Sequence, residues 1–268
     1  MKYLIPLVIV FLIYVIIENF FILTVRREIF VKNGLRIAHI ADIHKKRYGK
    51  GNKRLCGKVR SENPDIILIS GDLVSRDCTD FSRAETTLRS LAEICPVYLV
   101  YGNHEQDLSE EYKNKLKEAV KRSGAVLLEN KTVRLDINGN KVSLSGLVLK
   151  YSVYKKDGHY RNLDVTDKAE ITESIGEASD GKNILLVHNP LFAEDYAQWG
   201  ADYAVCGHVH GGSVVIPFTR IGVLSPERKF FPKYSKGVYT VGKMKLLLSG
   251  GLGKPRLFNF PELVIYEI

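Results

Sequence analysis

The chain has 268 residues and a formal net charge of +9 at pH 7. Hydrophobic residues make up 45% of it, which excludes a generally disordered chain and suits one large domain or two small ones. The four cysteines form no closely spaced pair, so no disulfide framework is indicated. The positive charge favours a polyanionic partner, such as a phosphate ester, an anionic membrane surface or nucleic acid, but it suits a merely basic enzyme equally well.

The N-terminal segment, residues 1–30, is predicted to anchor the chain in a membrane. Tyr3 to Val25 is almost wholly apolar, interrupted by Glu18 and Asn19, and as a helix it is long enough to cross a hydrocarbon core. No small-residue cleavage site follows it, which favours an uncleaved signal anchor. We therefore expect one transmembrane helix, followed by a single domain over residues 31–268.

The side of the cell membrane on which the domain lies is harder to predict. Arg26, Arg27 and Lys32 follow the apolar stretch, and the positive-inside rule would keep the domain cytoplasmic. A very short N-terminal tail on a signal anchor favours the opposite side. The two rules conflict, and our expectation leans to an extracytoplasmic domain.

Short apolar runs predict buried strands, and their order predicts the fold class. The runs lie at residues 35–41, 66–70, 97–101, 184–187 and 203–206. Segments with helical spacing at residues 81–94 and 106–123 alternate with the first of them, and Asn138-Gly139 is a strong hairpin signal. Early alternation of strands and helices, followed by hairpins, predicts an α/β protein, a layered α/β/β/α sandwich of mixed sheets flanked by helices.

Each of these runs leads into side chains that can bind a metal. They are Asp42, His44, Asp72, Asn103, His104, His188, His208 and His210. Only His39 and His159 lie outside the pattern, and we interpret them as a core histidine and a loop histidine. A single such residue is more simply a turn former or a hydrogen-bonded histidine. Five coincidences at the ends of strands, where ligands bind in open α/β sheets, instead indicate a ligand site.

The composition of this set indicates the kind of ion. Aspartate, asparagine and histidine ligands without cysteine favour a divalent metal such as Mn, Fe or Zn. Eight candidate residues are too many for one ion and suit two. Two close cations could clamp a phosphoryl group and generate hydroxide from a shared water. Asp72 follows the central strand and is the carboxylate best placed to bridge them, with one oxygen for each metal.

In chain order, these residues form a set of motifs that resembles a known family. The motifs are Asp42-x-His44, Gly71-Asp72, Gly102-Asn103-His104-Glu105, His188-x-Pro190 and Gly207-His208-x-His210. They resemble those of the calcineurin-like metallophosphoesterase superfamily. Gly211-Gly212, Gly250-Gly251-Leu252-Gly253 and Pro261-Glu262 resemble a narrower branch, bacterial membrane-anchored or exported phosphoesterases, some of which act on phosphorylated lipids.

The resemblance implies a role for each residue of the set. Asp42, His44 and His210 would hold the first metal. Asn103, His188 and His208 would hold the second, with Asp72 as the bridge. His104 would lie beside the metals without binding them, and would stabilise the transition state or protonate the leaving oxygen. Glu105 stands where the motif more often has aspartate, and we expect its longer side chain still to orient His104.

These observations predict a dinuclear metal-dependent phosphoesterase that hydrolyses phosphomonoesters or phosphodiesters by metal-activated hydroxide. A phosphorylated lipid or another envelope molecule is one option for the substrate. A nucleotide or nucleic-acid phosphodiesterase is the alternative within the enzyme class, and an inactive scaffold is the alternative outside it. No aromatic stacking platform accompanies the basic run Lys45–Arg60, so no nucleic-acid partner is expected. Phe230 and Phe231 could dip into a membrane interface or pack on their own loop. The oligomeric state is left open.

Overall fold

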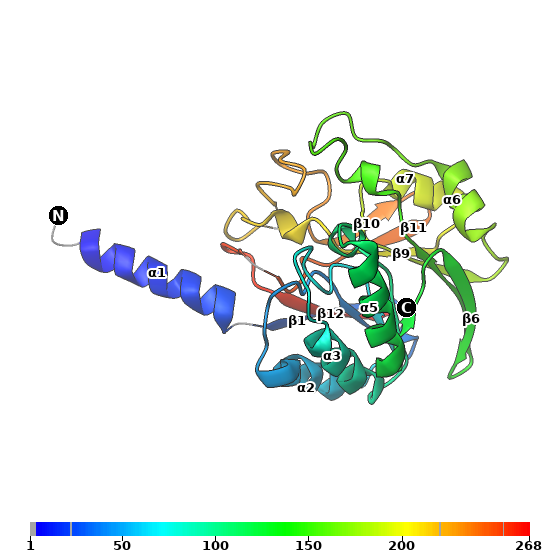
Figure 1. Ribbon diagram of the computed structural model, residues 1–268, viewed down its shortest axis with the longest axis horizontal. Coiled ribbons are helices and arrows are strands. Elements are labelled where there is room, and N and C mark those ends of the chain that lie inside the picture. Colours follow the sequence, from blue (N-terminus) through cyan, green and yellow to red (C-terminus); the bar gives the residue numbers. More distant parts are fainter. Residues whose placement is uncertain (1–3, 22, 220, 254) are drawn as a thin grey trace.

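The computed structural model describes residues 4–21, 23–219, 221–253 and 255–268, and these form two facing sheets with helices outside them (Figure 1). In spatial order, the first sheet consists of β1 (Thr24–Ile29), β12 (Glu262–Glu267), β2 (Arg36–Ile40), β3 (Ile66–Ile69), β4 (Val97–Leu99) and β5 (Val126–Leu127). Strands β2 to β5 are parallel to one another. Strand β12 is antiparallel to β2 and parallel to β1.

The second sheet is mixed in the same way. In spatial order it consists of β10 (Gly237–Val241), β11 (Met244–Leu248), β9 (Tyr203–Cys206), β8 (Lys182–Val187), β7 (Asn140–Leu147) and β6 (Lys131–Ile137). Its central strands β11, β9, β8 and β7 are parallel, and each outer strand pairs in antiparallel fashion. Most of the site residues described below follow the parallel central strands of the two sheets.

Helices cover the outer face of each sheet. The first sheet packs against α2 (Lys53–Ser61), α3 (Ser82–Ala92) and α5 (Glu110–Ser123), and the second against α6 (Lys168–Ile175) and α7 (Ala193–Trp199). The remaining short elements are α4 (Asn103–Gln106) and the single turns Lys50–Asn52, Tyr151–Val153 and His210–Gly212. The result is a layered arrangement of helices, sheet, sheet and helices, as the sequence predicted.

The apolar runs fill both sides of each sheet. In β3, Ile66 and Leu68 face the second sheet, whereas Ile67 and Ile69 pack against the helices. Such a strand is buried on both faces, which is why it reads as an unbroken apolar run and not as an alternating one. Because both faces of β3 are buried, its residues cannot slip along the sheet. The end of the strand, and with it the position of Asp72, is therefore fixed.

One local prediction is confirmed, and another needs a shift of boundary. The hairpin between β6 and β7 turns at Asn138 and Gly139, whose φ angles are 52° and 80°. The helix expected from residue 106 begins instead at Glu110, because the Ser109 hydroxyl caps it by accepting from Tyr112 N at 3.5 Å. Residues 103–106 form the separate short helix α4, which belongs to the site.

The N-terminal segment differs from the prediction. Helix α1 covers Leu4–Phe20 and projects away from the sheets (Figure 1). Within the described residues, no helix combines the length and the apolarity that crossing a membrane requires. The structure therefore does not support the transmembrane helix expected over residues 3–25, of which residues 3 and 22 lie outside the described residues.

The physical reason is that the end of the apolar stretch contacts the domain. Glu18 and Asn19 are buried, and the Glu18 carboxylate accepts from Phe258 N at 3.0 Å. The Asn19 side chain donates to Arg256 O at 2.8 Å and accepts from Arg256 N at 2.9 Å. Strand β1 then pairs with β12, so residues that the sequence analysis assigned to the anchor are part of the first sheet.

Candidate metal centre

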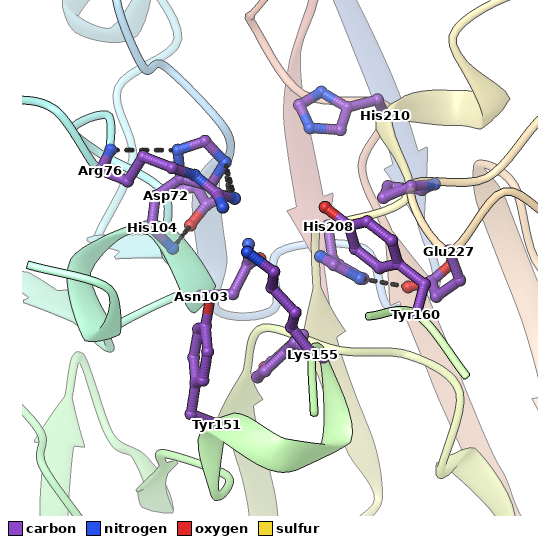
Figure 2. Close-up of a pocket in the computed structure, with 12 residues that line it drawn as sticks. Asp72, Arg76, Asn103, His104, Tyr151, Lys155, Tyr160, His208, His210 and Glu227 are labelled. Atoms are coloured by element: carbon purple, nitrogen blue, oxygen red, sulfur yellow. Dashed lines mark hydrogen bonds and ion pairs between the residues drawn. The ribbon is translucent and has the colours of Figure 1, made fainter. Parts of the chain in front are cut away.

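The eight residues predicted for the site lie together at one edge of the two sheets. Asp42, His44, Asp72, Asn103 and His104 follow strands of the first sheet, and His188, His208 and His210 follow strands of the second. Figure 2 shows part of this group around a shared pocket. The carboxyl ends of parallel strands therefore meet here, as expected for a ligand site in α/β sheets.

The backbone at this edge is held in an unusual conformation. Positive φ angles occur at Asp42 (52°), His44 (51°), Asp72 (53°), His208 (72°) and His210 (50°). Non-glycine residues seldom adopt this region, and such residues cluster where a site is held in place by its surroundings. The sharp turns after the strands aim these side chains at one another.

Gly251, in the loop between β11 and β12, packs closely against Asp42. Gly251 has a φ of 75°, and a Cβ atom at this position would lie 2.6 Å from Asp42 Oδ2. Only glycine allows this approach, which explains one of the glycines in the sequence Gly250-Gly251-Leu252-Gly253.

One cluster of side chains matches the first predicted metal position. Ligand atoms of Asp42, His44, Asp72 and His210 all lie within 4.8 Å of one another. The Nε2 atoms of His44 and His210 are 3.4 Å apart, and His44 Nε2 is 3.6 Å from Asp72 Oδ2. Two imidazoles and two carboxylates at this spacing suit a divalent cation of borderline softness.

A second group converges on the other side of Asp72. His188 Nδ1 lies 2.6 Å from the carbonyl oxygen of Ser70 and donates to it, which leaves the lone pair of a neutral His188 on Nε2. That Nε2 atom lies 3.2 Å from Asn103 Oδ1 and 3.4 Å from Asp72 Oδ2. A neutral His188 would present a third acceptor atom to these two buried oxygens, so the group favours a cation, either a proton or a metal ion, between them.

The charge state of His188 reflects the same requirement. Burial lowers its pKa, but the carboxylates of Asp72 and Asp42 outweigh burial and raise the pKa to about 9. In the metal-free protein, a proton on His188 supplies the positive charge that stabilises these carboxylates. The donor set therefore fits a divalent metal, which would displace that proton on binding.

Asp72 lies between the two groups with one particular oxygen. Its Oδ1 atom accepts from the backbone amide of His104 at 2.9 Å. Its Oδ2 atom is the one that approaches both His44 and His188. The sequence analysis expected one oxygen for each metal, whereas this geometry directs a single oxygen, Oδ2, toward both positions.

Glu105 fixes the turn that presents Asp72. Its buried carboxylate accepts from the backbone amides of Asp72 at 2.9 Å, Val74 at 2.9 Å and Gly102 at 2.8 Å. Burial raises the pKa of Glu105 to about 7, despite the amides that stabilise its charged form. We expected Glu105 to orient His104; it instead ties the turn after β3 to the start of α4.

Arg76 contacts both nitrogens of the His104 ring, which also packs against His44 with ring centres 4.4 Å apart. The backbone amide of Arg76 donates to His104 Nδ1 at 3.2 Å, so the ring proton belongs on Nε2. The Arg76 guanidinium lies 3.0 Å from that Nε2 atom (Figure 2). It also pairs with Asp107 at 3.0 Å. Burial lowers the pKa of His104 to about 4, and the charge of Arg76 adds to this effect, so the ring is a neutral N–H donor at pH 7.

A pocket of about 150 Å³ opens above these groups. Besides predicted site residues, it is lined by Arg76, Tyr151, Tyr154, Lys155, Tyr160, Pro226 and Glu227. The sequence analysis identified none of these seven as site residues, because each lies in a loop without a recognisable spacing. The basic and aromatic residues around 155–161 and 228–234 were the only signal that could have indicated them.

Glu227 and Tyr154 are the buried members of the added residues. The Glu227 carboxylate contacts Nε2 of His208, and both side chains are buried. Burial opposes ionisation of Glu227, but the interaction with His208 outweighs it and lowers the pKa to about 2. Tyr154 packs its ring against both His188 and His208, with ring centres 5.9 Å and 5.0 Å apart.

The two histidines outside the motif set lie outside the site. His39 is fully buried in β2, and its Nε2 atom is 2.8 Å from Ser70 Oγ, as suits a core histidine. His159 is exposed in the loop after β7.

Comparison with known proteins agrees with this geometry. The sequence model of the calcineurin-like phosphoesterase family matches residues 35–212, more than half of the chain. The chain belongs to this family. It is therefore a metal-dependent phosphoesterase, as the sequence predicted.

Individual relatives of this phosphoesterase extend the match beyond the motifs. It is 26% identical over 245 residues to the metallophosphoesterase YkoQ of Bacillus subtilis, across 87% of this chain and 83% of YkoQ. It is 25% identical over 211 residues to the phosphodiesterase YaeI of Escherichia coli, across 77% and 71% of the two chains. The crystal structure of the phosphopantetheinyl hydrolase PptH from Mycobacterium tuberculosis has the same fold, with a TM-score of 0.50, 17% identity, and coverage of 81% and 89%.

Proposed function

We propose that this phosphoesterase holds two divalent metal ions and hydrolyses phosphomonoesters or phosphodiesters. The proposal is supported most by a group of atoms beside the four-residue cluster. In this group, His188 Nε2 lies 3.2 Å from Asn103 Oδ1 and 3.4 Å from Asp72 Oδ2. Asp72 would then belong to both ion positions. One ion could not satisfy two separate groups of ligands that meet only at this residue.

The proposed assignment follows the two groups. Asp42, His44 and His210 would hold the first ion, and Asn103, His188 and His208 the second, with Asp72 shared. Ions such as Mn, Fe or Zn, when bound, supply Lewis-acid activation of water and neutralise phosphate charge. The side chains of the pocket would orient the ester and exclude esters that do not fit it.

His104 and Arg76 would bind the phosphate. Because His104 carries its proton on Nε2, this N–H group and the Arg76 guanidinium are two donors only 3.0 Å apart. Two donors do not satisfy each other, but one phosphate oxygen could accept from both. His104 would thereby stabilise charge on the phosphate or on the leaving oxygen, and Lys155 at the pocket wall would add a second cation.

Metal-free full-length protein, reloaded with Mn, tests the proposal on aryl phosphomonoesters, aryl phosphodiesters, nucleotides and phosphorylated lipids. We expect metal-dependent hydrolysis of at least one class and loss of it with a chelator. Arg76→Gln should lower kcat/KM about 10- to 100-fold, the value of a hydrogen bond to a charged group. Arg89→Gln, on the exposed face of α3, is the matched control. Absence of metal-dependent hydrolysis across all classes would refute the proposal.

We also propose that the protein works at a membrane surface on a lipid-linked phosphate ester. Helix α1 exposes apolar side chains along its length, including Leu4 at 62%, Leu7 at 66% and Val10 at 64%. Exposed apolar surface of this extent marks an interaction site. On the domain, Phe230 and Phe231 add further exposed apolar surface, with exposed fractions of 71% and 62%.

Residues 255–258, in the loop between β11 and β12, contact both α1 and a groove beside the site. Phe258 is partly exposed and stacks on Tyr14 of α1 with ring centres 5.4 Å apart. Pro255, in the same loop, lines a groove of about 370 Å³ together with His44, His104 and His210. A lipid bound along α1 would therefore reach the predicted metal ligands without leaving the surface.

Co-sedimentation with vesicles tests this second proposal. Full-length protein should bind vesicles that contain anionic phospholipid, and Phe230→Ser/Phe231→Ser should weaken binding while aryl phosphate hydrolysis stays unchanged. Equal binding by the parent and the double variant would show that these aromatic residues do not contact lipid. Failure of the parent to bind any vesicle would refute membrane action itself.

A further inference from the structure

The hairpin after β9 brings one buried carboxylate to the site. Leu224 and Phe230 form an antiparallel bridge, and Ser225 N donates to Lys229 O at 3.0 Å. Arg228, with a φ of 61°, closes the turn by donating from its amide to Ser225 O at 2.9 Å. Glu227 lies inside this tight turn and is 5% exposed.

The contact between Glu227 and His208 determines which ring nitrogen can bind a metal. An ionised carboxylate only accepts hydrogen bonds, so His208 Nε2, which contacts Glu227 Oε1, carries the ring proton. The lone pair of His208 is then on Nδ1. Figure 2 shows one nitrogen of the labelled His208 ring directed at Glu227 and the other on the side of the ring that faces Asn103.

The rest of the environment of His208 restricts the ring in the same orientation. Its backbone amide lies 3.2 Å from both carboxylate oxygens of Asp42, and its ring packs edge-on against His188 and Tyr154 at 4.9 Å and 5.0 Å. Among the described residues, the second Glu227 oxygen, Oε2, is buried without a hydrogen-bond partner. The packing around the buried pair therefore leaves the His208 ring little freedom to turn.

We infer that Glu227 is a positioning residue of the second metal position, which keeps His208 in the tautomer and orientation that bind the ion through Nδ1. This inference rests on the proposed two-metal function. A carboxylate behind a ligating histidine raises its basicity and fixes its orientation, and its loss typically costs 10- to 100-fold in metal affinity. The effect should be confined to the second ion, because the contact is with His208 and not with the ligands of the first.

Titration of metal-free full-length protein with Mn tests the inference without any substrate. We expect two binding equivalents for the parent, counted by calorimetry and by electron paramagnetic resonance. Glu227→Gln preserves side-chain volume, and Glu227→Met removes the acceptor altogether. Both should bind the first equivalent as the parent does and the second about 10- to 100-fold more weakly. Glu194→Gln is the control, since Glu194 pairs with Lys233 of the same loop outside the site.

A spectroscopic readout separates positioning from folding. In the parent, nitrogen-15 spectra of the metal-free protein should show His208 protonated on Nε2, and Glu227→Met should shift the ring toward a mixture of tautomers. Fewer than two Mn equivalents in the parent would refute the two-metal function. Two equivalents with parental affinities in both variants, or equal weakening of both ions, would refute the role of Glu227 while leaving that function intact.

Discussion

The two sheets contribute to the candidate site in different ways. On the first sheet, the turn that presents Asp72 is fixed by Glu105, a residue of a neighbouring motif, through three backbone amides. On the second sheet, each histidine has a single partner: Ser70 for His188, Glu227 for His208, and Asn259, which donates to the His210 carbonyl at 2.6 Å. The first half is therefore held through several backbone amides of its turns, and the second through single contacts to individual histidines.

This difference suggests that the two halves respond differently to substitution. The local turns should stay in place when a ligand is removed, since their backbone hydrogen bonds remain. The histidines of the second sheet should lose orientation when a distant partner is removed, although the fold remains. Asp72 is the exception, because it belongs to the first sheet and contacts both groups of ligands.

The largest effect is expected for Asp72→Ala. Removal of Oδ2 takes a ligand from both ion positions, and several kcal/mol of transition-state stabilisation should be lost, which corresponds to about 10³-fold or more in kcat. His208→Ala or His210→Ala should instead empty one position first. Mn stoichiometry and hydrolysis of an aryl phosphate measure both. Asp77→Asn, an exposed carboxylate that pairs with Lys45, is the control. Retention of two ions by Asp72→Ala would contradict the shared role.

A smaller effect, on stability, is expected for Glu105→Ala. Three buried amides would lose their acceptor, and each unsatisfied group costs about 1–3 kcal/mol, so the free energy of unfolding should fall by about 3 kcal/mol or more. Glu227→Met is the matched variant from the other half, and it should cost less because Glu227 contacts one side chain and no backbone amide of a strand end. Urea unfolding of metal-free protein measures the difference. Equal losses would remove the contrast between the halves.

The same contrast explains what the sequence could predict. The layered α/β fold and the family followed from apolar runs and from the motifs at their ends, because buried strands and sharp turns leave local patterns. The order of the motifs also grouped the eight residues that the structure brings together. Their partition between two ions rested on the resemblance, and it remains a prediction.

Other features depend on contacts between distant residues and left no local pattern. Glu227 reaches His208 from a loop whose sequence shows only prolines, aromatics and lysines. Arg76 contacts His104 through its backbone amide and its guanidinium, from a loop without a recognisable spacing. The contacts of Glu18 and Asn19 with Phe258 and Arg256 left no local pattern either, since in the sequence these two residues only interrupt an apolar stretch.

The smallest effect, on the pH dependence of stability, is expected at His39 in β2, a strand of the first sheet behind the site. His39 contacts the hydroxyl of Ser70, whose carbonyl holds His188. Burial lowers the pKa of His39 to about 3, below the value of about 6.5 in the unfolded chain. The unfolded state therefore binds a proton first as the pH falls below 6.5, and stability is lost there at up to about 1.4 kcal/mol per pH unit. Between pH 7 and pH 5 the loss should reach about 2 kcal/mol.

Replacement of His39 by a residue that does not titrate isolates this contribution. Urea unfolding of metal-free protein at pH 7, 6 and 5 should show a shallower decline in His39→Gln than in the parent, by about 2 kcal/mol over the range. The slopes are compared rather than the absolute values, because burial of an amide changes stability at every pH. The carboxylates and the other histidines titrate in both proteins and cancel in the difference. Parallel slopes would mean that His39 gains a proton in the folded protein. The strand behind the second-sheet histidines would then be as easily deformed as the loops that contact these histidines.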